Sequence, residues 1–350
     1  MYKVRLLAHT SLILFVACAL ACGSSGSGSA EKEIVAISYA GDLQVPHRKF
    51  LAAPFEAAHQ QVRVKLVPSE SEDVVAQIKA TRGVSPYDVI PLGEPRQITA
   101  IREDWIEQTP PEALPNLKDV HPEFIRACRG YGVPETYSLI GLAYNPDLVP
   151  EPKNWTDLWK GEYRGKIGIT TPASNLGFAF LALVAKLHGG SESDFGPAWP
   201  KLKELEPFVV APNPTALAQL FERGEIAIAP LWNNDAASLA GKGLKVKFAQ
   251  PAPGMIMVVS CLDVIKNSAH LELSRDYINR VASAEYQSQA VQPPWFFGPT
   301  NVNVKVPEAS AGYLPATTEE LFKVVMPMDW EAASQQRGQA TALFNREFSR

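Results

Sequence analysis

Short apolar runs alternate with amphipathic stretches along most of the chain, beginning near Glu33. The apolar runs with the length and residue types of strands are 34–39, 62–67 and 87–91. The stretches with apolar residues at helical spacing are 47–59, 71–79 with Ser71 as its cap, and 94–103. Because strands and helices alternate, the pattern predicts a largely parallel α/β sheet.

A second set of the same kind begins after residue 140. Its predicted elements are strands at 166–170 and 226–231 and an apolar helix at 176–188, which Gly189 and Gly190 end. Two longer apolar runs, at 140–145 and 255–265, flank this set, so we expect the chain to leave a first lobe, build a second and return. The predicted organisation is a first lobe over 33–140, a second lobe over 141–254, and a return over 255–350 that includes the C-terminal helices.

Polar side chains follow the predicted strands at the points where the strands end. In open α/β sheets, ligands bind beyond the carboxyl ends of the strands, so these residues are the candidates for ligand contact. They are Tyr39, Asp42, Glu94, Ser174, Asn175, Trp232 and Asp235. For each acid, a solvated turn carboxylate is the alternative, and helix capping would explain Ser174 or Asn175 equally well.

The length and the net charge of the chain limit the number of domains and the kinds of partner that we expect. With 350 residues, of which 46% are hydrophobic, the chain is long enough for two compact domains. The formal net charge is -4 and no run of Lys and Arg occurs, so we expect no nucleic-acid partner.

The N-terminus has the pattern of an export signal. Lys3 and Arg5 precede an uncharged run over 12–21, which is too short to span a bilayer. The run ends in Ala19-Leu20-Ala21-Cys22-Gly23, which resembles a lipoprotein signal cleaved before Cys22; ordinary cleavage near Ala21 is the alternative. We therefore expect a signal peptide over 1–21, lipid on Cys22 and a Gly/Ser-rich tether over 22–32. The protein would then lie in the periplasm or on the outer cell surface, anchored to the membrane.

Two cysteines, Cys128 and Cys261, belong to the body of the protein. Export makes a disulfide between them possible, but nothing in the sequence shows that they are neighbours. We expect two buried thiols.

A series of short fragments becomes specific when their order and spacing are taken together. They are Val133-Pro134, Gly141-Leu142-Ala143-Tyr144-Asn145, Trp155-Thr156-Asp157-Leu158-Trp159, Tyr163-Arg164-Gly165-Lys166-Ile167, Gly224-Glu225-Ile226-Ala227-Ile228-Ala229, Leu231-Trp232-Asn233, Pro251 with Gly254, and Gly298-Pro299-Thr300-Asn301. This series resembles the type II periplasmic solute-binding proteins, in the branch of the spermidine and putrescine receptors and the ferric-iron receptors. The resemblance covers nearly all of the mature chain.

The resemblance implies two lobes joined by a hinge of two crossover strands, which close on a ligand held between them. It implies three partners: a small-molecule solute, an ABC permease and the ATPase of that permease. We expect a monomer. Trp232 matches the family's cleft tryptophan, and Tyr137 occupies an aromatic position just before the first crossover.

The polyamine receptors of this branch pair ammonium groups with carboxylates. Here Ser174 and Asn175 follow the second-lobe strand without an acid, and the return strand has Val258 and Ser260 where those receptors carry an aromatic residue and an acid. A diammonium ligand would therefore lose several kcal/mol per charge through desolvation, with little to offset it. The turn over 171–175 at a helix N-terminus suits a carboxylate or phosphonate, and Asp42 or Asp235 suits one cationic group.

The sequence lacks the residue patterns that are usual for metal sites and for common catalytic sites. No two tyrosines are adjacent and the histidines are scattered, so we expect neither ferric iron nor a cofactor. We find no Gly-x-Ser-x-Gly, His-Glu-x-x-His or phosphate-binding glycine loop. Cys128 has basic neighbours that would lower the pKa of its thiol, although the end of a surface helix explains them more simply.

The sequence therefore predicts a lipid-anchored, extracytoplasmic solute-binding protein of an ABC importer, and not an enzyme. The expected ligand is an amino-acid-like zwitterion, a carboxylate or a phosphonate. The alternatives are a polyamine receptor and, outside this class, a lipoprotein enzyme or sensor with the same fold.

Overall fold

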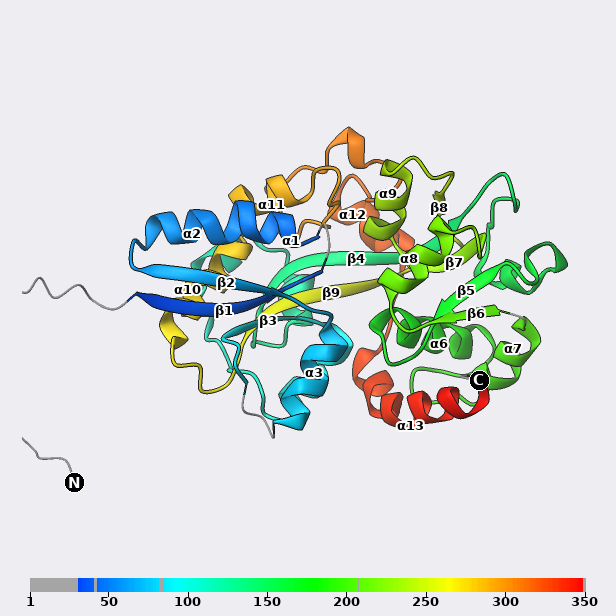
Figure 1. The fold of residues 1–350 in the computed structure, drawn as a ribbon, viewed down its shortest axis with the longest axis horizontal. Helices are drawn as coiled ribbons and strands as arrows, with labels where there is room; N and C mark the ends of the chain where they lie inside the picture. Colours follow the sequence, from blue (N-terminus) through cyan, green and yellow to red (C-terminus); the bar gives the residue numbers. More distant parts are fainter. Residues whose placement is uncertain (1–30, 41–42, 82–84, 207, 349–350) are drawn as a thin grey trace, which may run out of the picture.

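The computed structural model describes residues 31–40, 43–81, 85–206 and 208–348. The predicted signal peptide, Cys22 and Asp42 lie outside the described residues. The described part is a two-lobed α/β fold built on one sheet, in which β2, β1, β3, β9, β4, β7, β5 and β6 are neighbours in that order (Figure 1).

The first lobe contains three parallel strands, with β1 paired to both β2 and β3. Its strands are β1 (Lys32–Ser38), β2 (Val62–Pro68) and β3 (Val89–Gly93). Its helices are α1 (Gln44–Pro46), the π-helical η2 (His47–Ala52), α2 (Ala53–Ala58), α3 (Ser71–Ala80) and α4 (Glu94–Arg102). The predicted cap of α3 is wrong by one position: Glu70 is the N-cap residue, and the Ser71 hydroxyl instead donates to the carbonyl oxygen of Pro91 at 3.4 Å.

The second lobe repeats the parallel arrangement, with β5 paired to both β6 and β7. Its strands are β5 (Ile167–Thr170), β6 (Phe208–Ala211), β7 (Ile228–Trp232) and β8 (Lys247–Ala249). Its helices are η5 (Trp155–Trp159), η6 (Gly161–Tyr163), α6 (Asn175–Leu187), α7 (Ala198–Leu205), α8 (Pro214–Glu222) and α9 (Asn233–Gly241). The apolar helix α6 is buried over ten consecutive residues from Leu176 to Ala185, which explains its nearly continuous apolar sequence.

Two long strands, β4 (Val133–Tyr144) and β9 (Met255–Val264), join the lobes and pair antiparallel with each other. β9 also pairs antiparallel with β3 of the first lobe, and β4 with β7 of the second. The sheet is thus parallel within each lobe and antiparallel through the hinge, so the expectation of a largely parallel sheet holds only inside the lobes. The predicted lobe boundaries, 140/141 and 254/255, fall inside β4 and at the start of β9.

Three short helices precede β4: η3 (Pro111–Ala113), η4 (Pro115–Asp119) and α5 (Pro122–Ala127). The elements after β9 are α10 (Leu271–Val281), α11 (Ala284–Ala290), η7 (Glu308–Ser310), α12 (Thr318–Val324), the short strand β10 (Val325–Met326) and α13 (Trp330–Phe348). Among the described helices, none is both long and apolar enough to cross a membrane.

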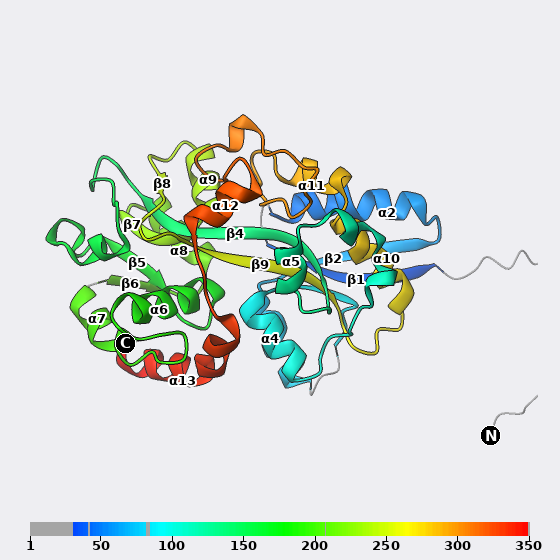
Figure 2. The same ribbon diagram turned by 180° about the vertical axis from the view of Figure 1, so that it is seen from behind.

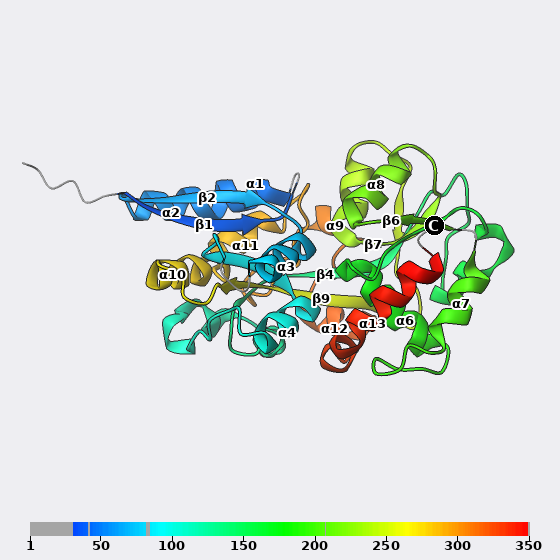
Figure 3. The same cartoon turned by 60° about the horizontal axis from the view of Figure 1, so that its bottom comes forward.

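The last helix, α13, lies on the second lobe although the chain returns to the first lobe before it. Trp330, Ala333, Ala340 and Phe344 share one buried apolar cluster with α6 and β5. Figures 2 and 3 show α13 beside α6 and α7. The return predicted over 255–350 therefore includes a third crossing between the lobes, after β10.

The expectation of two free thiols is wrong, because Cys128 and Cys261 form a disulfide. Cys128 is the C-cap residue of α5 and Cys261 lies in β9, and their Cα atoms are 5.8 Å apart. The two residues are 133 positions apart in the sequence, so only the packing of α5 against the hinge strand brings them together.

We predict that replacing both cysteines, Cys128→Ala with Cys261→Ala, lowers the free energy of unfolding by about 2–5 kcal/mol, because the crosslink restricts a long loop of the unfolded chain. Denaturant unfolding measures this difference. The midpoint of the wild type should fall when reductant is added, and the midpoint of the double variant should not respond. Equal midpoints for the oxidised wild type and the double variant would contradict the prediction.

Candidate functional site

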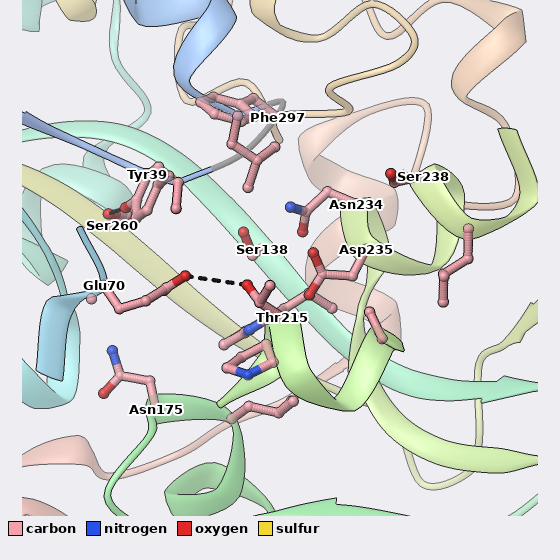
Figure 4. Close-up of a pocket in the computed structure, with 18 of the residues that line it drawn as sticks. Tyr39, Glu70, Ser138, Asn175, Thr215, Asn234, Asp235, Ser238, Ser260 and Phe297 are labelled. Carbon is pink, nitrogen blue, oxygen red and sulfur yellow. Dashed lines mark hydrogen bonds between the residues drawn. The ribbon is translucent and has the colours of Figure 1, made fainter. Parts of the chain in front are cut away.

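A cavity of about 400 Å³ lies between the two lobes, where the strands of both lobes end. Its floor is formed by the hinge strands, through Thr136 and Ser138 of β4 and Val258 and Ser260 of β9. The first lobe contributes Tyr39, Leu43, Glu70, Ser71 and Gly93. The second lobe contributes Asn175, Thr215, Glu222, Trp232, Asn234, Asp235, Ser238 and Lys242. Phe297, from the return segment, covers one side (Figure 4).

Two carboxylates from opposite lobes face this cavity. Glu70 precedes α3 in the first lobe, and its Oε1 accepts a hydrogen bond from the Thr215 hydroxyl of the second lobe at 3.4 Å. Asp235 lies in the first turn of α9. Burial, together with the charge of Glu70 and against that of Lys242, raises the pKa of Asp235 to about 7. The ionised form of Asp235 is therefore costly in this cavity unless a cation lies beside it.

The cation lining the cavity, Lys242, already has a carboxylate partner. Its Nζ lies 2.9 Å from Oε1 of Glu222, at the outer part of the second lobe. This pair is internally neutral, so among the described lining residues the carboxylates of Glu70 and Asp235 are those that a cation in the cavity could contact.

The apolar surface of the cavity comes from aromatic and aliphatic side chains. Trp232 is half-buried at the end of β7, and Phe297 and Val258 are buried. The rings of Phe297 and Tyr39 meet edge to face, with centroids 6.3 Å apart. A ligand in this cavity could thus place an apolar part against Trp232 and Phe297 while its polar ends reach the carboxylates or the floor.

Tyr39 connects the cavity to a buried ionisable cluster. Its hydroxyl is hydrogen-bonded to that of Ser260, and burial together with the charge of Glu135 raises its pKa well above the usual range. Behind it, His47 and Glu135 form a fully buried pair, and the Tyr286 hydroxyl donates to Oε1 of Glu135 at 3.1 Å. Tyr39 is therefore a neutral phenol whose position is supported from behind.

Of the residues predicted from the sequence, the structure brings four together in the cavity: Tyr39, Asn175, Trp232 and Asp235. Ser174 is instead completely buried as the N-cap of α6, where its hydroxyl accepts from the Gly177 backbone. Glu94 and Tyr137 also lie outside the cavity lining.

Glu94 and Tyr137 have structural environments of their own. Burial raises the pKa of Glu94 to about 7 against the opposing charge of Arg129, which lies 3.6 Å away. The ring of Tyr137 is stacked on Phe124, with centroids 5.5 Å apart, in the core of the first lobe. The side chains of Tyr137 and of its neighbours Thr136 and Ser138 alternate along β4, and the two neighbours line the cavity.

Glu70, Thr136, Ser138, Asn234 and Phe297 also line the cavity, although they were not among the candidates predicted from the sequence. Glu70 stands just after the end of β2, so the same rule that selected Tyr39 would have selected it. The described residues contain no group of three or more His, Cys, Asp or Glu side chains that could hold a metal ion.

The chain is similar to a known protein family and to several of its members. The profile of the family described as "Bacterial extracellular solute-binding protein" matches residues 51–317. The Spermidine/putrescine-binding periplasmic protein of Escherichia coli (strain K12) is 25% identical over 202 residues, which cover 55% of this chain and 57% of the relative. The match thus spans little more than half of that relative.

Solved structures are similar over almost their full length, and two of them serve as examples. A putative extracellular solute-binding protein from Bordetella parapertussis has a TM-score of 0.71 at 23% identity, covering 91% of this chain and 99% of that one. AgtB from A. tumefaciens R10, in complex with agropinic acid, has a TM-score of 0.74 at 18% identity with the same coverage. At these identities the likeness is one of fold.

We predict that Asp235→Asn stabilises the ligand-free protein near pH 8 and changes its stability little near pH 4. The pKa of about 7 in the folded protein lies above the usual 3.8, so the unfolded chain loses this proton first. Asp235 therefore lowers the stability of the wild type as pH rises from about 4 to about 7, and the Asn variant lacks this contribution.

Denaturant unfolding of both proteins across this pH range measures the difference. Asp73→Asn, at an exposed position of α3, is the control: it keeps Asp235, so its difference in stability from the wild type should not vary with pH. A difference between Asp235→Asn and wild type that does not vary with pH would contradict the prediction.

Proposed function

The chain belongs to the bacterial extracellular solute-binding proteins, and on this premise we propose that it captures a small organic solute bearing an ammonium group for an ABC importer. The observation that carries the proposal is the presence of Glu70 and Asp235, from opposite lobes, in one cavity. An ammonium group between them would offset the cost of ionising Asp235 in the cavity and would bring the lobes together.

The solute class that we favour is an amino-acid-like zwitterion. Besides the two acids, the cavity offers hydroxyl and amide groups at Ser138, Asn175 and Asn234, which suit the acceptor oxygens of a carboxylate. A cavity of about 400 Å³ has the size of typical small-molecule sites. Trp232 and Phe297 would cover the carbon chain between the two charged ends.

A polyamine is the second candidate, and one observation favours it specifically. Glu70 adds a second carboxylate that the strand-end analysis of the sequence did not include, so two ammonium groups could both be neutralised. The relative from Escherichia coli is described as spermidine/putrescine-binding, which agrees with this candidate.

The proposed cycle involves binding and release without chemistry on the solute. The solute would bind between the lobes, and an ABC permease with its ATPase would read the closed form. The predicted position in the periplasm or on the cell surface, anchored through Cys22, agrees with this role.

We predict that a thermal-shift screen against amino acids, ω-amino acids, diamines, spermidine and phosphonates identifies an ammonium-bearing ligand. With that ligand, Trp232→Ala should weaken binding about 3- to 30-fold, because the desolvated contact with the ring is lost. Isothermal titration measures the affinity. Trp199→Ala, at a partly buried tryptophan outside the cavity, is the control.

Two results would contradict the proposed function. One is a hit list that contains only anions without an ammonium group. The other is wild-type affinity in a folded Glu70→Gln, Asp235→Asn double variant, since both carboxylates are then neutral.

For the anchor, we predict that Cys22→Ser releases the protein from membranes while its unfolding midpoint stays unchanged, because lipid on this cysteine would hold the tether and not the core. Membrane fractionation with metabolic lipid labelling measures this. A wild-type protein that carries no lipid and washes off freely would show that the anchor proposal is wrong.

A further inference from the structure

Asn175, which lines the cavity, is contacted by a side chain from the other end of the sequence. Nη2 of Arg337, in α13, donates to Oδ1 of Asn175 at 2.8 Å across 162 positions. Arg337 is only 6% exposed, and its guanidinium lies 4.1 Å from the ring centroid of Phe178, one turn further along α6. The contact is therefore buried and well packed.

The chemistry of the two side chains fixes the orientation of the Asn175 amide. A guanidinium has donors only, whereas an amide has one accepting and one donating edge. Because Arg337 can only donate, it holds the accepting edge, and Nδ2 is turned the other way. Nδ2 lies 2.8 Å from the place that a Cβ at Gly93 would occupy, and Gly93 lines the same cavity from the first lobe. The donating edge thus faces the space between the lobes.

The helix that carries Arg337 contacts both lobes. This helix, α13, is packed on the apolar core of the second lobe through Trp330, Ala333 and Phe344. One turn before Arg337, the Ser334 hydroxyl donates to the carbonyl oxygen of Pro95 in α4 of the first lobe at 3.2 Å. The orientation of the Asn175 amide is therefore set by a helix that contacts both lobes.

We propose that Arg337 is a positioning residue that determines ligand specificity: it turns the Asn175 amide so that the cavity presents a hydrogen-bond donor. This proposal rests on the proposed function, in which Glu70 and Asp235 hold an ammonium group. A solute with an acceptor such as a carboxylate at its other end then gains a hydrogen bond, whereas a second ammonium group meets a donor and gains none. Arg337 thereby selects an amino acid over a diamine of equal length.

The test uses two matched probes, 4-aminobutanoate and putrescine, which differ in one end group. Isothermal titration gives the ratio of their affinities for the wild type, Arg337→Lys, Arg337→Gln and Asn175→Asp. The wild type should prefer 4-aminobutanoate, and Arg337→Lys should keep the preference because lysine also only donates. Arg337→Gln should reduce the preference about tenfold, since glutamine can hold either edge of the amide. Asn175→Asp should shift it towards putrescine.

A change in packing alone would weaken both probes equally and leave the ratio unchanged. An unchanged ratio in a folded Arg337→Gln, or a wild-type preference for putrescine, overturns the proposal.

If the wild type binds neither probe, the expected ligand class is wrong and the ligand-free protein decides the role of Arg337. Nuclear magnetic resonance detects the side-chain NH₂ signals of Asn175, which are identified by their loss in Asn175→Asp. These signals should move in Arg337→Gln and move less in Arg337→Lys. Signals that do not respond to Arg337→Gln overturn the proposal.

Discussion

The antiparallel pairing of β4 with β9 is the constraint on which the rest of the structure depends. The pairing runs from Val133 opposite Leu262 to Ile140 opposite Ile256, and it is the junction between the parallel sets of the two lobes. Because both strands continue into both lobes, the ends of β1 and β3 meet those of β5 and β7 over one floor. Asn233, at the start of α9, secures this floor: its Oδ1 accepts the Leu139 N–H of β4 at 2.8 Å. The position of the cavity follows from this geometry.

The charges of the cavity are coupled to the separation of the lobes. Glu70 belongs to the first lobe and Asp235 to the second, and the charge of Glu70 disfavours ionisation of Asp235 in a site of low dielectric constant. Under the proposed function, a bound ammonium group would add an attraction to each carboxylate that outweighs their mutual repulsion. Repulsion between the ionised carboxylates would then favour separation of the lobes, and the bound solute would favour closure. The same two groups would provide both affinity and the conformational response, provided that the ligand carries a positive charge.

The sequence predicted the features that local patterns determine. The helix predicted over 176–188 is α6, which is shifted by one residue at each end, and the apolar run at 255–265 is β9, which ends one residue earlier, because apolar spacing and terminating glycines are local signals. The features that it missed depend on tertiary packing. The disulfide joins residues 133 positions apart, and the contact of Arg337 with Asn175 spans 162. For the same reason Ser174 and Asn175, adjacent in sequence, differ in environment: one is a buried cap, while the other lines the cavity.

The buried pair of His47 and Glu135 shows how the floor is held in place. The register of β4 against β9 shifts between Pro134 and Thr136, so Glu135 is the extra residue of a bulge. A bulge re-aims its side chain, and here Glu135 reaches His47 of η2 and Tyr286 of α11. Burying such a pair is costly in solvation, so stability alone does not explain its presence. The ring of His47 is 5.9 Å from that of Tyr39, whose hydroxyl is bonded to Ser260 on the cavity floor. The pair therefore ties the helices of the first lobe to the hinge strand and packs beside the ring of Tyr39, where Tyr39 enters the cavity.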